Sequence, residues 1–284
     1  MEWSLSKIIR IETGSVGISI TDLRALLQHY GVTDAVQHDE LVALARAAKV
    51  RPWWDQYKGL ASAPFLLSLG YESAAAIIRN HEPIVIPGLL QTEEYAKHLL
   101  TLATPEDQLA TIPPRLELRL ERQERLLQAG GPELHFIFDE SAIMRAVGGP
   151  DLMRRQVRRL QELSEHPRVT MRILPLTAGY PLPNYGVAYV LYEFTDPEED
   201  VVLYLENPEG EVVVREGQDW DASVSPASYL ESFYGLEQSA RRGDVAQFLT
   251  SAHARHSVLA EDAANRRRRE IDVTSGLNEA DAEP

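Results

Sequence analysis

The periodicity of the apolar residues changes in the middle of the chain, and this change constrains the fold more than any other feature. Between about residues 60 and 130 the pattern is helical, with YESAAAIIRN, LLQTEEYAKHLL and RLELRLERQERLLQ each predicting a helix. After Gly130 and Gly131, the segments LHFIFDE, RVTMRILPL and GVAYVLYEF have the short apolar or alternating pattern of strands. DVVLYLENPEGEVVV predicts a hairpin, and PASYLESFYGLEQSA returns to a helix. The sequence therefore combines helices and strands.

We predict an α+β fold with an incomplete N-terminal helical module, a helical middle, and a small, mostly antiparallel sheet with flanking helices. Pro52 ends the first segment, so residues 1–50 form one module and residues 53–260 form the main domain. Residues 261–284 contain almost no apolar side chains, which predicts a disordered polar tail.

The N-terminal segment predicts three short helices. The first covers about residues 4–12, where Ser4 is a suitable N-cap and Gly14 a C-terminal stop. Its polar face carries Ser6, Lys7 and Arg10, which are available to a phosphate or a base edge. ITDLRALLQHYGV and DELVALARAAKV predict the other two helices.

Composition excludes several classes of protein. The 284 residues include no cysteine, so disulfides and thiolate chemistry are excluded, and the expected location is the cytoplasm. The sequence contains no run of about 18 apolar residues, so it predicts no membrane-spanning helix. The formal net charge of −15 argues against broad nucleic-acid affinity, although residues 1–50 are close to neutral and are compatible with a small DNA-binding module.

Two segments suggest a binding site for a ligand or a partner. In IVIPGLLQTEEYA, Gln91 and Thr92 lie at a predicted helix N-terminus, where exposed N–H groups can bind an anion or carboxylate. A locally satisfied cap is the alternative that we favour. The loop in PLTAGYPLPNYGVAYV carries Tyr180, Asn184 and Tyr185, which either face a ligand or belong to an ordinary connection.

The remaining motifs give no indication of catalysis. Asp139 and Glu140 are adjacent residues and point to opposite sides of a strand, so a helix cap is preferred to an acid–base pair. Trp53 and Trp54 are interpreted as packing residues of a linker rather than as a platform for a base. The sequence has no GxSxG, no P-loop, no GxGxxG after a strand and no HxxxH. We therefore expect no enzymatic activity, no metal and no cofactor.

These strings together resemble a known family. WSLSKIIRIETG followed by ITDLRALLQHYGV is similar to the second half of the lambda-repressor-like (XRE-type) helix-turn-helix of actinobacterial regulators. WWDQY, YESAAAIIRNHEPIVIPGLLQTEEYA, DESAIMRAVGG, RVTMRILP and ENPEG resemble the C-terminal domain of unknown function that accompanies this helix-turn-helix in antitoxin-like regulators. The resemblance covers about residues 3–250.

The resemblance implies a cytoplasmic, DNA-binding transcriptional regulator, homodimeric on a palindromic site, with a small partner protein of toxin-like or developmental type. Ser4, Ser6, Lys7 and Arg10 would then belong to the recognition helix. Two helices precede this helix in the family and are missing here, so DNA binding is expected to be impaired. Either the start codon is assigned too late, or the chain is a stand-alone ligand-binding or catalytic module that no longer binds DNA.

Overall fold

The structure is a computed structural model that describes residues 3–12, 17–47, 51–179, 184–196, 199–207, 210–216, 224–240 and 245–280. It divides the chain into two compact units, residues 1–56 and residues 57–284. The boundary lies six residues after the predicted end of the N-terminal module at residue 50.

The N-terminal unit contains the three predicted short helices. They are α1 (Leu5–Glu12), α2 (Ile20–His29) and α3 (Ala35–Ala47). α2 and α3 pack through a small apolar core formed by Leu23, Leu27, Val42 and Ala45. Ser19 is the N-cap of α2, because its Oγ accepts a hydrogen bond from the N–H of Asp22 at 3.0 Å.

The C-terminal unit is built on a six-stranded sheet with the order β3-β2-β1-β4-β5-β6. The strands are β1 (Ile77–Glu82), β2 (Glu133–Asp139), β3 (Val169–Leu174), β4 (Ala188–Glu193), β5 (Val202–Asn207) and β6 (Gly210–Val214). The pairs β1–β2 and β2–β3 are parallel, and the other three pairs are antiparallel. The sheet is therefore mostly antiparallel, which confirms the predicted α+β class.

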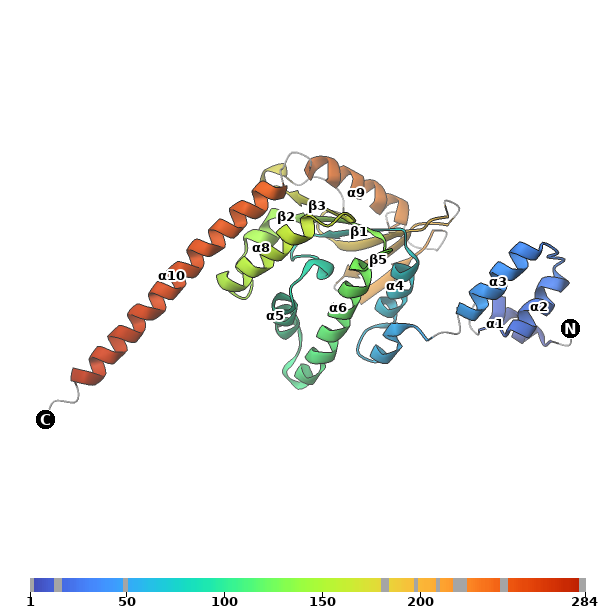
Figure 1. Ribbon diagram of the computed structural model, residues 1–284, viewed down its shortest axis with the longest axis horizontal. Helices are drawn as coiled ribbons and strands as arrows, with labels where there is room; N and C mark the ends of the chain where they lie inside the picture. Colours follow the sequence, from blue (N-terminus) through green and yellow to red (C-terminus); the bar gives the residue numbers. More distant parts are fainter. Residues whose placement is uncertain are drawn as a thin grey trace. The chain divides into compact units, whose positions relative to one another are not determined.

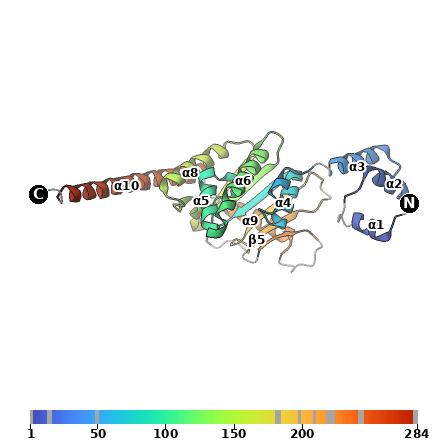
Figure 2. The same ribbon diagram turned by 90° about the horizontal axis from the view of Figure 1, so that it is seen from below.

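Helices cover both faces of this sheet (Figures 1 and 2). They are α4 (Ala63–Ala74), α5 (Glu93–Ala103), α6 (Ile112–Leu127), α7 (Glu140–Met144), α8 (Pro150–Ser164), α9 (Pro226–Ala240) and α10 (Val245–Ala280). Short 3-10 turns connect them, η1 (Trp53–Tyr57), η2 (Gly88–Leu90), η3 (Glu106–Thr111) and η4 (Leu176–Ala178). α9 covers one face, and α4, α5, α6, α7, α8 and α10 pack on the other.

The alternation of side chains along the strands explains why both faces are covered. In β4, Tyr189 and Leu191 are buried against α9, whereas Val190 and Tyr192 belong to the core on the opposite face. Successive side chains of a strand point to opposite faces, so a strand that is apolar at every position needs a layer on each side. The result is a three-layered sandwich with two apolar cores.

One sequence prediction was wrong at the centre of the sheet. YESAAAIIRN was predicted as a single amphipathic helix, but α4 ends at Ala74 and the last four residues of this string begin β1. Residues 78–81 are buried, and the backbone of β1 pairs with β2 on one side and β4 on the other. Pairing on both edges and burial on both faces outweigh the helical periodicity of the short segment.

The polar C-terminal segment also differs from its prediction. Residues 261–284 were predicted to be a disordered tail, whereas α10 continues to Ala280. Ala, Arg and Glu have high helix propensity, and a segment that extends an existing helix needs no new nucleation. Within the described part of the chain, no helix is both long enough and apolar enough to span a bilayer.

Candidate ligand-binding site

A pocket of about 680 Å³ lies between the sheet and the helices α4, α5 and α6. Its volume is within the range of about 300–1,000 Å³ that is typical of sites for small molecules. β1 and β5 run in the same direction, because each is antiparallel to β4, and both strands end at this pocket. We call it the polar pocket, because charged and amide side chains form much of its lining.

The strands supply the acidic side of the polar pocket. Asn80 and Glu82 of β1 face it, as do Tyr204 and Glu206 of β5, because residues two apart on a strand share a face. Glu211 joins them from β6. Three of these five side chains are therefore carboxylates.

Helix α6 supplies the basic side. Arg115, Arg119 and Arg122 are four and three residues apart, so they lie along one face of the helix and line the pocket. The guanidinium of Arg122 donates to both carboxylate oxygens of Glu72, with Nε at 2.9 and 2.8 Å and Nη2 at 2.5 Å. Glu72 is 4% exposed, so this buried pair neutralises Arg122.

Arg119 is held by the side-chain amide of Gln91. Its Nη1 donates to Oε1 of Gln91 at 2.6 Å, and Nε2 of Gln91 donates to the carbonyl oxygen of Ile86 at 2.7 Å. Gln123 of α6 donates to the carbonyl oxygen of Gln91 at 3.1 Å. Gln91, which the sequence singled out as a binding residue, therefore lines the pocket and positions a guanidinium.

Apart from Arg122, the acidic and basic side chains of the pocket form no ion pairs with one another within the described residues. Each carboxylate accepts a hydrogen bond from a neutral donor: Glu82 from the N–H of Ile84, Glu206 from the hydroxyl of Tyr204 at 3.3 Å, and Glu211 from the hydroxyl of Ser62. In the described part of the chain, these three carboxylates, Arg115 and Arg119 form no ion pair. The Nε of Arg115 is buried and has no hydrogen-bond partner there.

Burial shifts the protonation of the pocket. It raises the pKa of Glu82 to about 8, and the negative charge of Glu206 adds to this shift. The N–H of Ile84 and the charge of Arg119 act in the opposite direction on the pKa of Glu82. Burial also raises the pKa of Glu211. At neutral pH Glu82 is therefore mostly protonated, and a nearby cation would ionise it.

The predicted ligand residues lie on opposite faces of the sheet. Thr92, beside Gln91, is the N-cap of α5: its Oγ1 accepts from the N–H of Tyr95 at 3.3 Å, and its own N–H donates to Gln156 at 2.7 Å. This is the locally satisfied cap that we favoured from the sequence. Asn184 and Tyr185 contact the core beside α9, and Tyr180 lies outside the described residues.

The α9 face contains a polar cluster of its own. The hydroxyl of Tyr185 donates to Oδ2 of Asp139 at 2.6 Å, and Oδ1 of Asp139 accepts from the N–H of Ser141 at 2.7 Å, which caps α7. Nε2 of His81 lies 2.8 Å from the carbonyl oxygen of Tyr185, and burial lowers the pKa of His81, so the ring is neutral. Asn184 donates to the hydroxyl of Ser232 at 3.3 Å. These hydrogen bonds join loop, strand and helix, and the predicted cap at Asp139 is confirmed.

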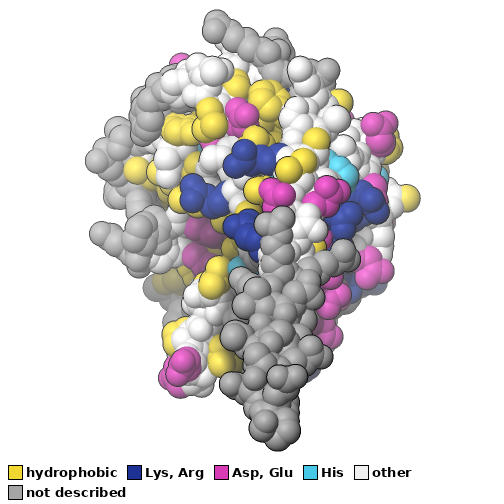
Figure 3. Space-filling view, turned by 90° about the vertical axis from the view of Figure 1, so that its left-hand side faces the viewer, with side chains coloured by type: hydrophobic (Ala, Val, Ile, Leu, Met, Phe, Trp, Pro, Cys, Tyr) yellow, Lys and Arg dark blue, Asp and Glu magenta, His cyan; other side chains and the backbone are white. Residues whose placement is uncertain are grey.

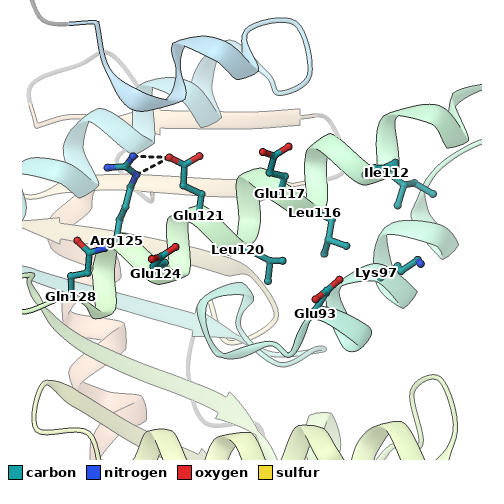
Figure 4. A pocket seen from close by; sticks show the side chains of 11 residues that line it. Glu93, Lys97, Ile112, Leu116, Glu117, Leu120, Glu121, Glu124, Arg125 and Gln128 are labelled. Carbon is teal, nitrogen blue, oxygen red and sulfur yellow. Dashed lines mark hydrogen bonds and ion pairs between the residues drawn. The ribbon is translucent and has the colours of Figure 1, made fainter.

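A second cavity of about 770 Å³ lies between α5 and α6 (Figure 4). Leu116 and Leu120 point from α6 toward α5 and form an apolar floor. The charged side chains along it are mostly exposed, and Arg125 is paired with Glu121 at 2.6 Å. Exposed charges interact weakly with a ligand because water screens them, so the polar pocket is the stronger candidate site.

The residues predicted to contact DNA include one basic side chain that is already paired. In α1, Nζ of Lys7 lies 3.2 Å from Oδ2 of Asp22 and 4.4 Å from the ring centroid of Trp3. Ser4 and Ser6 lie at the start of the same helix, with their hydroxyls 3.3 Å apart; α1 also includes Arg10, whose side chain the structure does not describe.

The arginines of α8 do not form a purely basic surface either. Arg154 pairs with Asp151, Arg155 with Glu94 and Arg159 with Glu162. On the face shown in Figure 3, Lys and Arg side chains are likewise interspersed with Asp and Glu. Within the described residues no group of His, Asp and Glu is arranged to hold a metal ion.

Sequence reasoning identified Gln91 but missed the charged groups around it. The spacing of Arg115, Arg119 and Arg122 was visible in RLELRLERQER, yet it was attributed to a solvated helix whose side chains pair along its surface. Glu82 was missed because β1 itself was not predicted. No local pattern relates Glu82 or Glu206 to α6, because the sheet brings these residues together.

Residues 67–232 match a family described as a domain of unknown function, DUF5753. The matched segment is more than half of the chain and includes all six strands and most of the polar pocket. No curated protein matches the chain, and no solved structure matches it.

Proposed function

The chain belongs to the DUF5753 family. From the resemblance of its N-terminal segment to an XRE-type helix-turn-helix and from the polar pocket, we propose that it is a DNA-binding transcriptional regulator whose C-terminal unit binds a small ligand. The observation that carries the ligand-binding part is the polar pocket. It has the size of a ligand site, and it contains carboxylates and guanidinium groups that form no ion pairs within the described residues. Arg115 and Arg119 are only partly exposed, and a charge held away from water without an ion-pair partner costs free energy, part of which a complementary ligand would recover.

The DNA-binding part of the proposal rests on the N-terminal unit. It packs as a separate unit of three short helices, and it resembles an XRE-type helix-turn-helix in sequence. In the proposal, DNA is contacted by residues at and after the start of α1, namely Ser4, Ser6, Lys7 and Arg10. The protein acts as a homodimer in the cytoplasm. Its partner is a small toxin-like or developmental protein. Binding of a ligand to the C-terminal unit would then alter the affinity for DNA or for that partner.

One observation favours the alternative, a ligand-binding module that does not bind DNA. The ammonium of Lys7 is already paired with Asp22, and a phosphate would have to compete with that carboxylate. Arg10 would then be the main basic contact of α1.

Selection of DNA from a random pool by the full chain tests the proposal. We expect only weak enrichment of a palindromic sequence, with binding that weakens further as salt rises because counterions are released. Lys7→Ala should weaken binding about threefold to tenfold, whereas Lys97→Ala, an exposed lysine on α5, serves as the charge-matched control and should not. If no sequence is enriched, the chain is not a sequence-specific regulator.

A further inference from the structure

The polar pocket has two chemically different sides, one from the sheet and one from α6, which we call its carboxylate end and its arginine end. The carboxylates of Glu82, Glu206 and Glu211 come from the sheet, whereas the guanidinium groups of Arg115 and Arg119 come from α6. Apolar side chains from the other lining segments complete the wall, namely Leu60, Phe65, Val85, Leu99, Leu100 and Leu118. From this arrangement we infer that the pocket binds a short peptide or a peptide-like zwitterion, with its ammonium group at the carboxylates and its carboxylate group at Arg115 and Arg119. The inference rests on the proposed function, because it assumes that the pocket is a ligand site.

The carboxylates form no ion pair within the described residues, although Arg119 lies close enough to lower the pKa of Glu82. Glu206 is close enough for its charge to raise the pKa of Glu82, and the hydrogen-bond donors to these two carboxylates are neutral groups. Two neighbouring carboxylates repel each other, and this repulsion is relieved either by a proton or by a cation between them. An ammonium group is small, donates three hydrogen bonds and carries the missing positive charge.

The arginine end lacks an anion. Nε of Arg115 is buried without a partner, and Arg119 is already oriented by the side chain of Gln91 at 2.6 Å. A carboxylate can accept two parallel hydrogen bonds from a guanidinium, so it satisfies such a group better than water or an amide does. Arg122 is excluded from this role because Glu72 already occupies its donors.

The combination selects a zwitterion over simpler ligands. A polyamine would place positive charge beside Arg115 and Arg119, and a dicarboxylate would place negative charge beside Glu82 and Glu206. Both would suffer repulsion at one end, which is an effective way of excluding wrong ligands. The apolar wall and the volume of about 680 Å³ favour a molecule with an apolar body over a single small amino acid.

Calorimetric titration of the full chain with four forms of one tripeptide, Leu-Gly-Leu, tests the inference. The forms have both termini free, the N-terminus acetylated, the C-terminus amidated, or both ends blocked. We expect the free form to bind, and each single block to weaken binding by about tenfold or more, because it removes the charged partner of one side of the pocket. The unaltered protein is used throughout, so this series does not depend on the folding of a variant.

Substitutions then assign the two ends. Glu82→Gln should abolish most of the difference in affinity between the free and the acetylated peptide. Arg115→Gln should abolish most of the difference in affinity between the free and the amidated peptide. Arg125→Gln, on the same helix but in the cavity between α5 and α6, is the matched control and should retain both differences. Thermal melting of each variant checks that it is folded.

Two outcomes would overturn the inference: equal binding of the free and the doubly blocked peptide, or no binding of the free peptide at about 1 mM. Neither outcome affects selection of DNA by the N-terminal unit, so failure of the ligand class is distinguishable from failure of the regulator. Peptide binding without selection of any DNA sequence would support the ligand class and contradict the regulator.

Discussion

The two faces of the sheet are made from the same strands, but the polar cluster on one face differs from the pocket on the other in how its groups are satisfied. Toward α9, His81, Tyr185 and Asp139 bond to one another and to the backbone, among aromatic side chains such as Phe233. Toward α6, Glu82 and Arg115 lie in an open pocket without charged partners among the described residues. A polar cluster that is internally satisfied contributes to stability, whereas one that is incomplete is suited to bind something else.

The largest expected effect is on stability, in the core beneath α9. Phe233 is 1% exposed, so Phe233→Ala should lower the free energy of unfolding by about 3–5 kcal/mol through lost burial and a cavity. Leu99→Ala, in the wall of the polar pocket, should lower the free energy of unfolding by clearly less, because the side chain of Leu99 is only half-buried and borders the pocket. Urea denaturation followed by circular dichroism measures both, and equal losses would contradict the difference between the faces.

The next effect is the dependence of stability on pH. The pKa of Glu82 is about 8 in the folded protein and 4.5 as a free side chain, so the folded state retains a proton that the unfolded state has lost between these values. Glu82 therefore makes stability fall as pH rises from 4.5 to 8, by at most about 1.4 kcal/mol per pH unit. Glu82→Gln should flatten the profile over this interval.

The control for this profile is Glu124→Gln, which removes an exposed carboxylate of α6 and should leave the pH dependence of stability unchanged. Urea denaturation at a series of pH values provides the measurement. An unchanged slope in Glu82→Gln would show that this carboxyl group ionises in the folded state as it does in water.

The smallest expected effect separates the two polar clusters most directly. Tyr185→Phe removes the hydrogen bond to Asp139 on the α9 face and should lower the free energy of unfolding by about 1–2 kcal/mol. Binding of the free tripeptide should not change, because Tyr185 lies on the opposite face from the polar pocket. A loss of peptide affinity in a folded variant would place the ligand site on the α9 face instead.

Local sequence was sufficient wherever short-range forces decide the structure. The caps at Thr92 and Asp139 and the hairpin of β5 and β6 were predicted correctly, because each depends on residues a few positions apart. The helices α1, α2, α3, α5, α6 and α9 were predicted for the same reason. Gln91 was also identified, although its contact with Arg119 was not.

Only the tertiary structure determined the centre of the sheet and the polar pocket. β1 is a strand because β2 and β4 pair with both of its edges, and those partners are 50 or more residues away in the chain. The polar pocket then follows, since Glu82 of β1, Glu206 of β5 and Arg119 of α6 meet only after the sheet has formed. Local propensity can favour a helix or a cap, but which charges are buried together is decided by packing between distant segments.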